Sequence, residues 1–252
     1  MIENYEIWID GVSNKDVGVR IASPLRLGAA VPRITTQSVP GRNGDLHTFD
    51  GSYKNRKGTF SAYVYEDNEV KAAFGGVHKW LYGNAGYRRV ETDDDRDHYL
   101  LARVKSGADI DARIRKIAPF AVELDCKPQR FLISGDEGII VDSEVVIYNP
   151  TGYAALPKIE VYLRDLNMFP NTAGDGVVKV GDAVINITGM KYGTGNSFIY
   201  DAETENAAAK NGTSRNSHVS VVGDVILPEG ETKITVSGDI THIKIIPRWW
   251  EL

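Results

Sequence analysis

The sequence has almost no cysteine: Cys126 is the single one among 252 residues. One thiol cannot form an internal disulfide or a cysteine-built zinc site, and its scarcity fits synthesis in a reducing cytosol. The sequence also lacks an apolar run long enough to span a bilayer. Its first residues, 1–6, are acidic and contain no apolar core, which does not fit a secretory signal. These absences argue against a disulfide-rich secreted protein and against a membrane-spanning one.

Motifs for catalysis and metal binding are missing as well. There is no Gly-x-Ser-x-Gly elbow and no phosphate-binding loop. The acidic run 93–98 lacks the spaced ligands of a calcium loop, so we expect a solvated hairpin tip there. Cys126 falls on the apolar face of an expected strand and should be inert core. The histidines are scattered without metal-ligand spacing, at His47, His78, His98, His218 and His242. We therefore expect a chain that is not an enzyme and that has no cofactor and no metal site.

Positive charge is scarce in the second half of the chain. Up to residue 130 there are 20 basic and 18 acidic residues, a net charge of +2. From residue 131 onward there are 9 basic and 16 acidic residues, a net charge of −7, which together give the total of −5. A chain of this charge is a poor candidate for gripping nucleic acid, which needs a surplus of Lys and Arg. The shift along the chain indicates two domains with different surfaces, which we place at 1–133 and 134–252.

Turn residues and two-residue alternation predict a fold built mainly of short β-strands. Residues 59–65 alternate between an apolar and a polar face. Residues 118–126 place four side chains on one apolar face, and this strand is expected to end at Lys127-Pro128. Other strands of the first half are expected at 6–9, 17–21, 33–39, 87–91 and 99–106.

The segment Pro40-Gly41-Arg42-Asn43-Gly44 holds two turn signals in five residues. Pro-Gly and Asn-Gly both suit positions where the backbone takes a positive φ. We therefore expect a hairpin tip or a projecting loop here, and its residues are our candidates for contact with another subunit or a partner.

One helix is expected at about 68–82, capped by Asp67 or Asn68. Its apolar stripe at helical spacing is Val70, Phe74, Val77 and Leu81, with Trp80 beside it. Gly83 suits a left-handed stop. The internal pair Gly75-Gly76 weakens the helix and suggests a closely approaching strand.

The second half is expected to be β throughout. Eight short strands at regular spacing predict a β-sandwich or jelly roll. A two-residue hairpin connection is expected at Gly181-Asp182, and 203–210 is expected to form one helical turn. The eight strands are expected at 144–148, 158–163, 176–180, 183–187, 197–200, 218–222, 231–237 and 241–246.

Several segments, which run in order over nearly the whole chain, carry a resemblance to a known family. They are Val39-Pro40-Gly41-Arg42-Asn43-Gly44-Asp45-Leu46, Gly51-Ser52-Tyr53-Lys54-Asn55-Arg56, Phe120 to Pro128, Tyr148-Asn149-Pro150-Thr151-Gly152 with 157–162, Ile199-Tyr200-Asp201, 227–234, and the terminal 245–252. Together these segments resemble the distal tail proteins of phages with long non-contractile tails. A departure from the family pattern is Asn43, where Asp is commoner.

The resemblance implies a structural hub of a bacteriophage tail tip. The first domain, β-sandwich-like with one helix, would form a hexameric ring with other copies of the chain. This ring would join the tail tube protein to the tail-tip or tail-associated lysin protein. DNA would pass through it without specific binding. The second domain would be a galectin-like β-sandwich that carries a receptor-binding protein or binds host glycan. The protein would be made in the host cytoplasm and reside at the tail tip of the virion.

Two other functions stay open on sequence grounds. The 12 Tyr and 4 Trp could line a sugar-binding face, as in a carbohydrate-binding module for host cell-wall glycan. The 34 acidic residues also leave open a hydrolase built on two opposed carboxylates.

Overall fold

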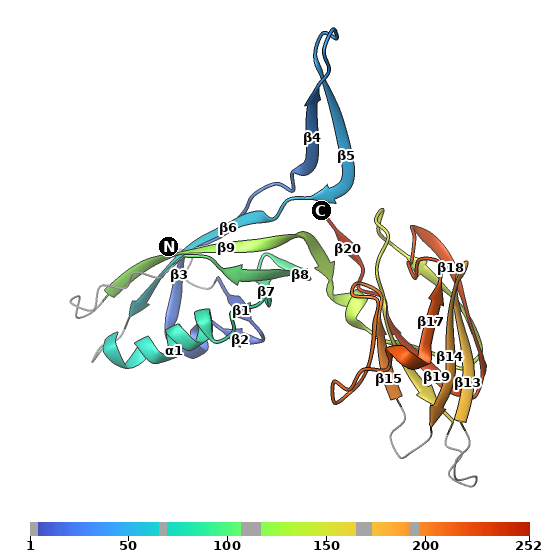
Figure 1. Cartoon of the computed structure of the whole chain (residues 1–252). Coiled ribbons are helices and arrows are strands. Elements are labelled where there is room, and N and C mark those ends of the chain that lie inside the picture. The colour runs from blue at the N-terminus through green and yellow to red at the C-terminus, as the bar shows by residue number, and fades with distance from the viewer. Residues whose placement is uncertain (1–4, 66–69, 107–116, 165–172, 192–196) are drawn as a thin grey trace. The chain divides into compact units, whose positions relative to one another are not determined.

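The computed structural model describes residues 5–65, 70–106, 117–164, 173–191 and 197–252. The fold is mainly β, as the sequence predicts. It divides into two compact units, 1–130 with Leu252 and 131–251, called here the first and second unit (Figure 1). No helix within the described ranges is long and apolar enough to cross a membrane.

The first unit is built on one large sheet, with strands in the order β2-β1-β7-β8-β9-β6-β3. A separate two-stranded sheet, β4-β5, interrupts the chain between β3 and β6. The elements are β1 (Ile7–Ile9), β2 (Val12–Ser13), the 3₁₀ turn η1 (Lys15–Val17), β3 (Val19–Leu27), β4 (Pro32–Ser38), β5 (Asp45–Tyr53), β6 (Arg56–Tyr65), α1 (Val70–Tyr82), β7 (Arg88–Thr92), β8 (Asp95–Val104) and β9 (Ile117–Leu132).

The two alternating segments pair with one another, as β6 and β9. Phe60 lies opposite Val122 and Ala62 opposite Phe120, and all four side chains are buried in one core. The expected end of β9 at Lys127-Pro128 is wrong, since the strand continues to Leu132. Proline is tolerated there because β6 pairs with β9 only as far as Cys126, so the missing N–H of Pro128 removes no bond to β6.

Helix α1 covers the core of the first unit with the expected stripe. Val77, Trp80 and Leu81 are buried, and Trp80 packs edge-on against Phe60. The side chains of Val70 and Phe74, and the caps at residues 67 and 68, lie outside the described part. The expected left-handed stop at Gly83 is wrong, because Gly83 is not among the glycines with positive φ. Its amide bonds to the Lys79 carbonyl, and a Cβ there would lie 2.5 Å from that oxygen, so space explains this glycine.

The sequence suggests that a strand approaches the helical glycines closely, and the structure does not show this. A Cβ at Gly75 would meet nothing within 4 Å, and one at Gly76 would first meet the Val17 side chain of η1 at 3.9 Å. We expect Gly75→Ala to stabilise the protein by about 1 kcal/mol, because alanine costs less backbone entropy in a helix. Urea unfolding of the full chain measures this. The matched control Gly11→Ala should destabilise instead, since Gly11 has a φ of +78°. A loss of stability in Gly75→Ala would contradict the observation that a Cβ at Gly75 meets no neighbouring atom.

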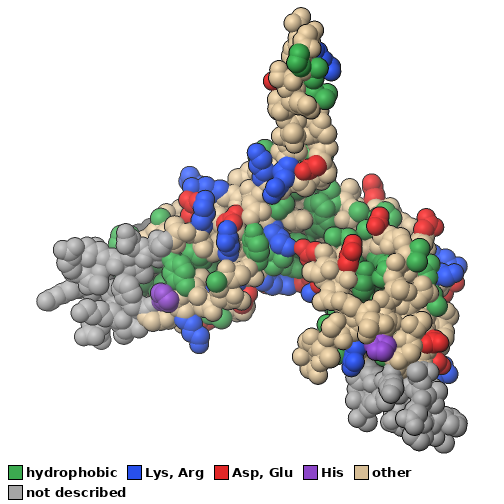
Figure 2. Space-filling view, viewed as in Figure 1, with side chains coloured by type: hydrophobic (Ala, Val, Ile, Leu, Met, Phe, Trp, Pro, Cys, Tyr) green, Lys and Arg blue, Asp and Glu red, His purple; other side chains and the backbone are tan. Residues whose placement is uncertain are grey.

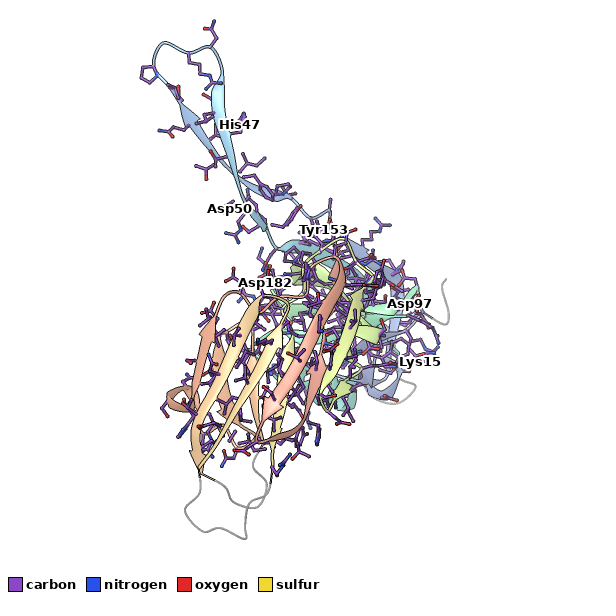
Figure 3. The ribbon with its side chains drawn as sticks, turned by 90° about the vertical axis from the view of Figure 1, so that its right-hand side faces the viewer. Lys15, His47, Asp50, Asp97, Tyr153 and Asp182 are labelled. Carbon is purple, nitrogen blue, oxygen red and sulfur yellow. The ribbon has the colours of Figure 1, made fainter. Side chains whose placement is uncertain are left out.

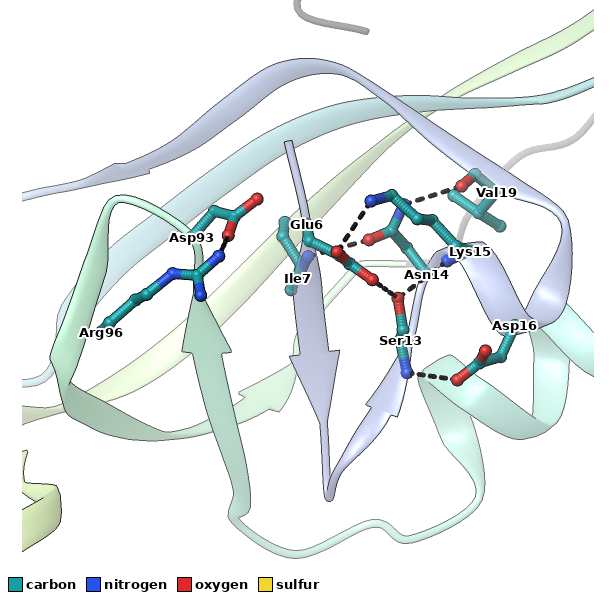
Figure 4. A network of polar contacts seen from close by, with 9 residues as sticks. All are labelled: Glu6, Ile7, Ser13, Asn14, Lys15, Asp16, Val19, Asp93 and Arg96. Carbon is teal, nitrogen blue, oxygen red and sulfur yellow. Dashed lines mark hydrogen bonds and ion pairs between the residues drawn. The ribbon is translucent and has the colours of Figure 1, made fainter. Parts of the chain in front are cut away.

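A polar network links β1, β2 and η1 (Figure 4). The Asn14 side chain is buried; it accepts the Ile7 amide at 2.8 Å and donates to the Val19 carbonyl at 2.8 Å. Beside it, Glu6 accepts from Ser13 at 2.6 Å and pairs with Lys15 at 2.7 Å. The hydrogen bonds from Lys15 and Ser13 lower the pKa of the Glu6 carboxyl. Asn14 thus bonds to a backbone amide of β1 and a backbone carbonyl at the start of β3, which links the two strands.

The second unit is a β-sandwich of two five-stranded sheets. One has the order β10-β19-β12-β15-β16 and the other β11-β18-β13-β14-β17. The elements are η2 (Ile133–Asp136), β10 (Ile139–Val141), β11 (Glu144–Asn149), β12 (Lys158–Leu163), β13 (Ala173–Val180), β14 (Ala183–Lys191), β15 (Ser197–Asp201), β16 (Asn206–Ala209), η3 (Asn216–His218), β17 (Val219–Val222), β18 (Gly230–Gly238), β19 (Ile240–Ile246) and β20 (Trp250–Glu251).

Alternate residues of these strands make one core. Ile159 and Val161 of β12 are fully buried with Ile243 and Ile245 of β19, which pair with them in register. Each of the eight predicted strands overlaps an observed one, and the Gly181-Asp182 hairpin is confirmed. The helical turn expected at 203–210 is wrong, because β16 forms there and pairs with β15.

Candidate functional site

The predicted turn segment forms the tip of the β4–β5 hairpin. Ser38 pairs with Asp45 as the last rung, and residues 39–44 connect the strands. Gly41 and Gly44 take φ values of +80° and +81°, which non-glycine residues rarely adopt. Pro40, Arg42 and Asn43 lie beside them at the tip, so sequence reasoning placed these five candidates correctly in the fold. Their role in contacts stays a prediction.

The hairpin is exposed along its length. Residues 31–52 are all exposed except Val39, which is half-buried. Figure 1 shows β4 and β5 standing clear of the other strands of the first unit. Figure 3 labels His47 and Asp50 on β5, and both residues are exposed. A two-stranded sheet of this kind has two unpaired edges within the described structure. Such edges are templates for pairing with another chain.

Apolar side chains gather on one face of the hairpin, near its base. Ile34 and Phe49 lie directly opposite one another in the ladder and are 52% and 49% exposed. The Phe49 ring meets the edge of Tyr53 at 5.6 Å between centroids. Further toward the tip the same face is polar, with Thr36 bonded to His47 at 3.1 Å. Figure 2 shows hydrophobic side chains on the surface of this hairpin.

Polar contacts fix the hairpin where it leaves the large sheet. The Lys54 amide donates to the Val31 carbonyl at 2.8 Å. The Arg56 guanidinium donates to the carbonyls of Gly28 at 2.7 Å and Pro128 at 3.2 Å. The Asn55 amide donates to the Tyr87 hydroxyl at 2.6 Å. An isolated two-stranded hairpin is marginally stable in water, so these contacts hold its base and leave the apolar face available.

In the part of the chain that the structure describes, the other residues considered for catalysis or metal binding do not form a site. Cys126 is buried, and burial raises the pKa of its thiol to about 12, so the thiolate that reactivity needs is absent at neutral pH. Asp93 and Asp94 of the acidic run form the β7–β8 turn, as predicted, but residues 95–98 are not part of the tip because they begin β8. Arg96 pairs with Asp93, and His98 with Asp95. Among the described residues no group of three His, Cys, Asp or Glu side chains could hold a metal.

Sequence reasoning missed the apolar base of the hairpin. Its signal was weak but present: β4 contains only one large apolar residue, Ile34, so it has no face to bury against a core. A strand of that composition, joined to a partner by a glycine-rich tip, is typical of an exposed arm rather than of a core hairpin.

Comparison with known proteins supports this fold over the whole chain. No protein-family model and no curated protein sequence matches the chain. Among solved structures, the crystal structure of the SPP1 Dit (gp 19.1) protein superposes with a TM-score of 0.61 and 13% sequence identity. That protein is described as a paradigm of the hub adsorption apparatus in phages that infect Gram-positive bacteria. The match covers 99% of this chain and 100% of the other. At this identity the likeness concerns the fold.

Proposed function

We propose that this chain is a structural hub of a bacteriophage tail tip. In this proposal residues 1–133 form a hexameric ring that joins the tail tube protein to the tail-tip or tail-associated lysin protein. Residues 134–252 carry the host-recognition component, and DNA passes through the ring without specific binding. The mature protein is part of the virion tail, after synthesis in the host cytoplasm.

The observation that carries the proposal is the exposed β4–β5 hairpin with its apolar face. Ile34 and Phe49 are directly opposed and about half exposed, which is costly on a chain that works alone and is typical of an interaction surface. The full-length likeness in fold to a phage hub protein supports the use of this surface for assembly. A closed ring repeats one heterologous contact between neighbours, and an arm that reaches a neighbour supplies such a contact.

Ring formation is the direct test. Light scattering coupled to gel filtration gives the mass of the purified chain, alone and mixed with tube and tip proteins of the same phage. Negative-stain images show its shape. We expect six-fold rings, formed by the chain alone or in the presence of its partners. A chain that stays monomeric in every mixture would overturn the proposal. The alternative, a carbohydrate-binding module, stays a prediction and would then be preferred.

A further inference from the structure

The second unit contains a cavity of about 510 Å³ that the hub proposal does not use. It opens where β16 and β17, the edge strands of the two sheets, both contribute to its lining. Such a volume lies within the range of ligand-binding pockets, about 300–1,000 Å³. The lining residues are Leu156, Tyr200, Ala202, Glu205, Ala207, Asn216, and the segment Val219 to Ile226 except Ser220 and Val222.

One wall of this cavity is apolar and partly open to solvent. Leu156 and Val221 are 39% and 36% exposed, and Val219 and Ile226 are half-buried beside them. The floor is Ala207, which is fully buried. This wall suits an aliphatic chain rather than a planar ring, because no exposed aromatic face lines the cavity.

The charge in the cavity has one sign. Glu205 and Asp224 are exposed carboxylates, while no Lys, Arg or His is among the residues that line it. Within the described structure neither side chain has a hydrogen bond or an ion pair. The third polar residue, Asn216, is already engaged, since it accepts the Ala207 amide at 2.6 Å and donates to Asn206 at 2.7 Å. Two carboxylates without a paired cation in the described structure therefore line the cavity.

The side chain of a buried tyrosine lines the same cavity. Tyr200 is 3% exposed, yet its hydroxyl makes no hydrogen bond to any described residue. Tyrosine hydroxyls in a folded core normally find a partner. The hydroxyl oxygen of Tyr200 is not itself fully buried, so it stays accessible to a hydrogen-bonding partner. Burial, followed by the nearby charges of Glu205 and Asp201, raises the pKa of this hydroxyl. It thus stays protonated and can donate to a ligand oxygen.

The backbone of one of these carboxylate residues, Glu205, lies in the left-handed region. Glu205 has a φ of +51°, a conformation that costs a non-glycine residue about 1–2 kcal/mol. Glycine would avoid that cost.

We propose that this cavity binds an arginine side chain presented by an extended peptide segment of a partner protein. The guanidinium would lie between Glu205 and Asp224, since its five donors suit two carboxylates. The aliphatic stem would lie on Leu156 and Val221. The Tyr200 hydroxyl would donate to a carbonyl of the peptide, and the outer edge of β17, unpaired in the described structure, would pair with its backbone. The site belongs to the second unit and does not depend on ring formation.

Fluorescence polarisation of labelled pentapeptides on the full chain tests this site. The probe is Ser-Val-Arg-Val-Ser with blocked ends, compared with the same peptide carrying Lys, Gln or Glu in the centre. We expect the Arg peptide to bind at least about tenfold more tightly than the Gln peptide, because hydrogen bonds to charged groups are the strong ones. Glu binding should be the weakest, and added salt should weaken Arg binding.

Variants locate the binding. Glu205→Gln and Asp224→Asn should each weaken Arg-peptide binding about tenfold, and Tyr200→Phe should weaken it several-fold. The matched control Glu144→Gln removes the same charge from β11, at the opposite edge of the sheet from β17, and should leave binding unchanged. Melting curves confirm that each variant folds; Glu205 and Asp224 are exposed, so these two tests survive even if Tyr200→Phe does not fold. Equal binding of the Arg and Gln peptides, or binding of only an N-acetylglucosamine oligomer added as a competitor, would overturn the proposal.

Discussion

A chain whose β4–β5 hairpin is cut back should fold normally and fail to assemble. In this variant residues 34–51 are replaced by Asn-Gly, which joins Arg33 to Ser52 through a two-residue hairpin turn. No residue in the removed segment is buried, and the contacts of Lys54 and Arg56 at the base are retained. We therefore expect the free energy of unfolding to change by less than about 1 kcal/mol. Melting of the purified protein measures this, and negative-stain images with tube and tip proteins should show no rings.

Point variants separate the apolar face from the length of the arm. Ile34→Ser with Phe49→Ser removes the exposed apolar pair, and each buried anchor in an interface is typically worth about 2 kcal/mol or more. The double variant should therefore weaken assembly by about a thousandfold. The matched control is Thr35→Ser with Thr48→Ser, a directly opposed pair on the other face of the same ladder, which should change assembly only a few-fold. Normal assembly of the first variant would refute the role given to this face.

The largest effect on stability is expected from Gly238→Ala, at the end of β18. Gly238 has a φ of +82°, and a Cβ there would lie 2.5 Å from the Asp175 carbonyl oxygen and 2.9 Å from the Gly176 Cα. Both atoms are backbone, so neither can rotate away. The left-handed conformation costs alanine about 1–2 kcal/mol, and overpacking about 1–3 kcal/mol more. We expect a total loss of about 2–5 kcal/mol, measured as a lowered urea midpoint.

Gly230→Ala, at the other end of the same strand, separates the conformational contribution from the overpacking contribution. Gly230 has a φ of +85°, but a Cβ there would meet nothing within 4 Å. This variant should therefore lose only the conformational part, about 1–2 kcal/mol. If both variants lose the same free energy, the close approach of Asp175 to β18 is not a constraint on this fold.

The candidate site was only partly visible in the sequence. The tip at Gly41 and Gly44 could be predicted, because turn chemistry depends on neighbours in the chain. The exposure of Ile34 and Phe49 could not, since it depends on whether another sheet covers the hairpin. The cavity was also out of reach: Tyr200, Glu205 and Asp224 come together only because β15, β16 and the segment after β17 meet in the sandwich.

The sequence by itself determined the type of several elements of this protein and the faces that they bury. The alternation in β6 and β9 and the periodic stripe of α1 specify which faces are buried, because side-chain direction repeats every two residues in a strand and about every 3.6 in a helix. Tertiary structure decided what local preference leaves open. Residues 206–209 became a strand because Ala207 pairs with Tyr200 and is buried in the core. Strand preference reflects the neighbours that a segment packs against rather than its own sequence. Pairing between distant segments therefore determined that the β4–β5 hairpin stays exposed and that a cavity forms at the edge of the sandwich.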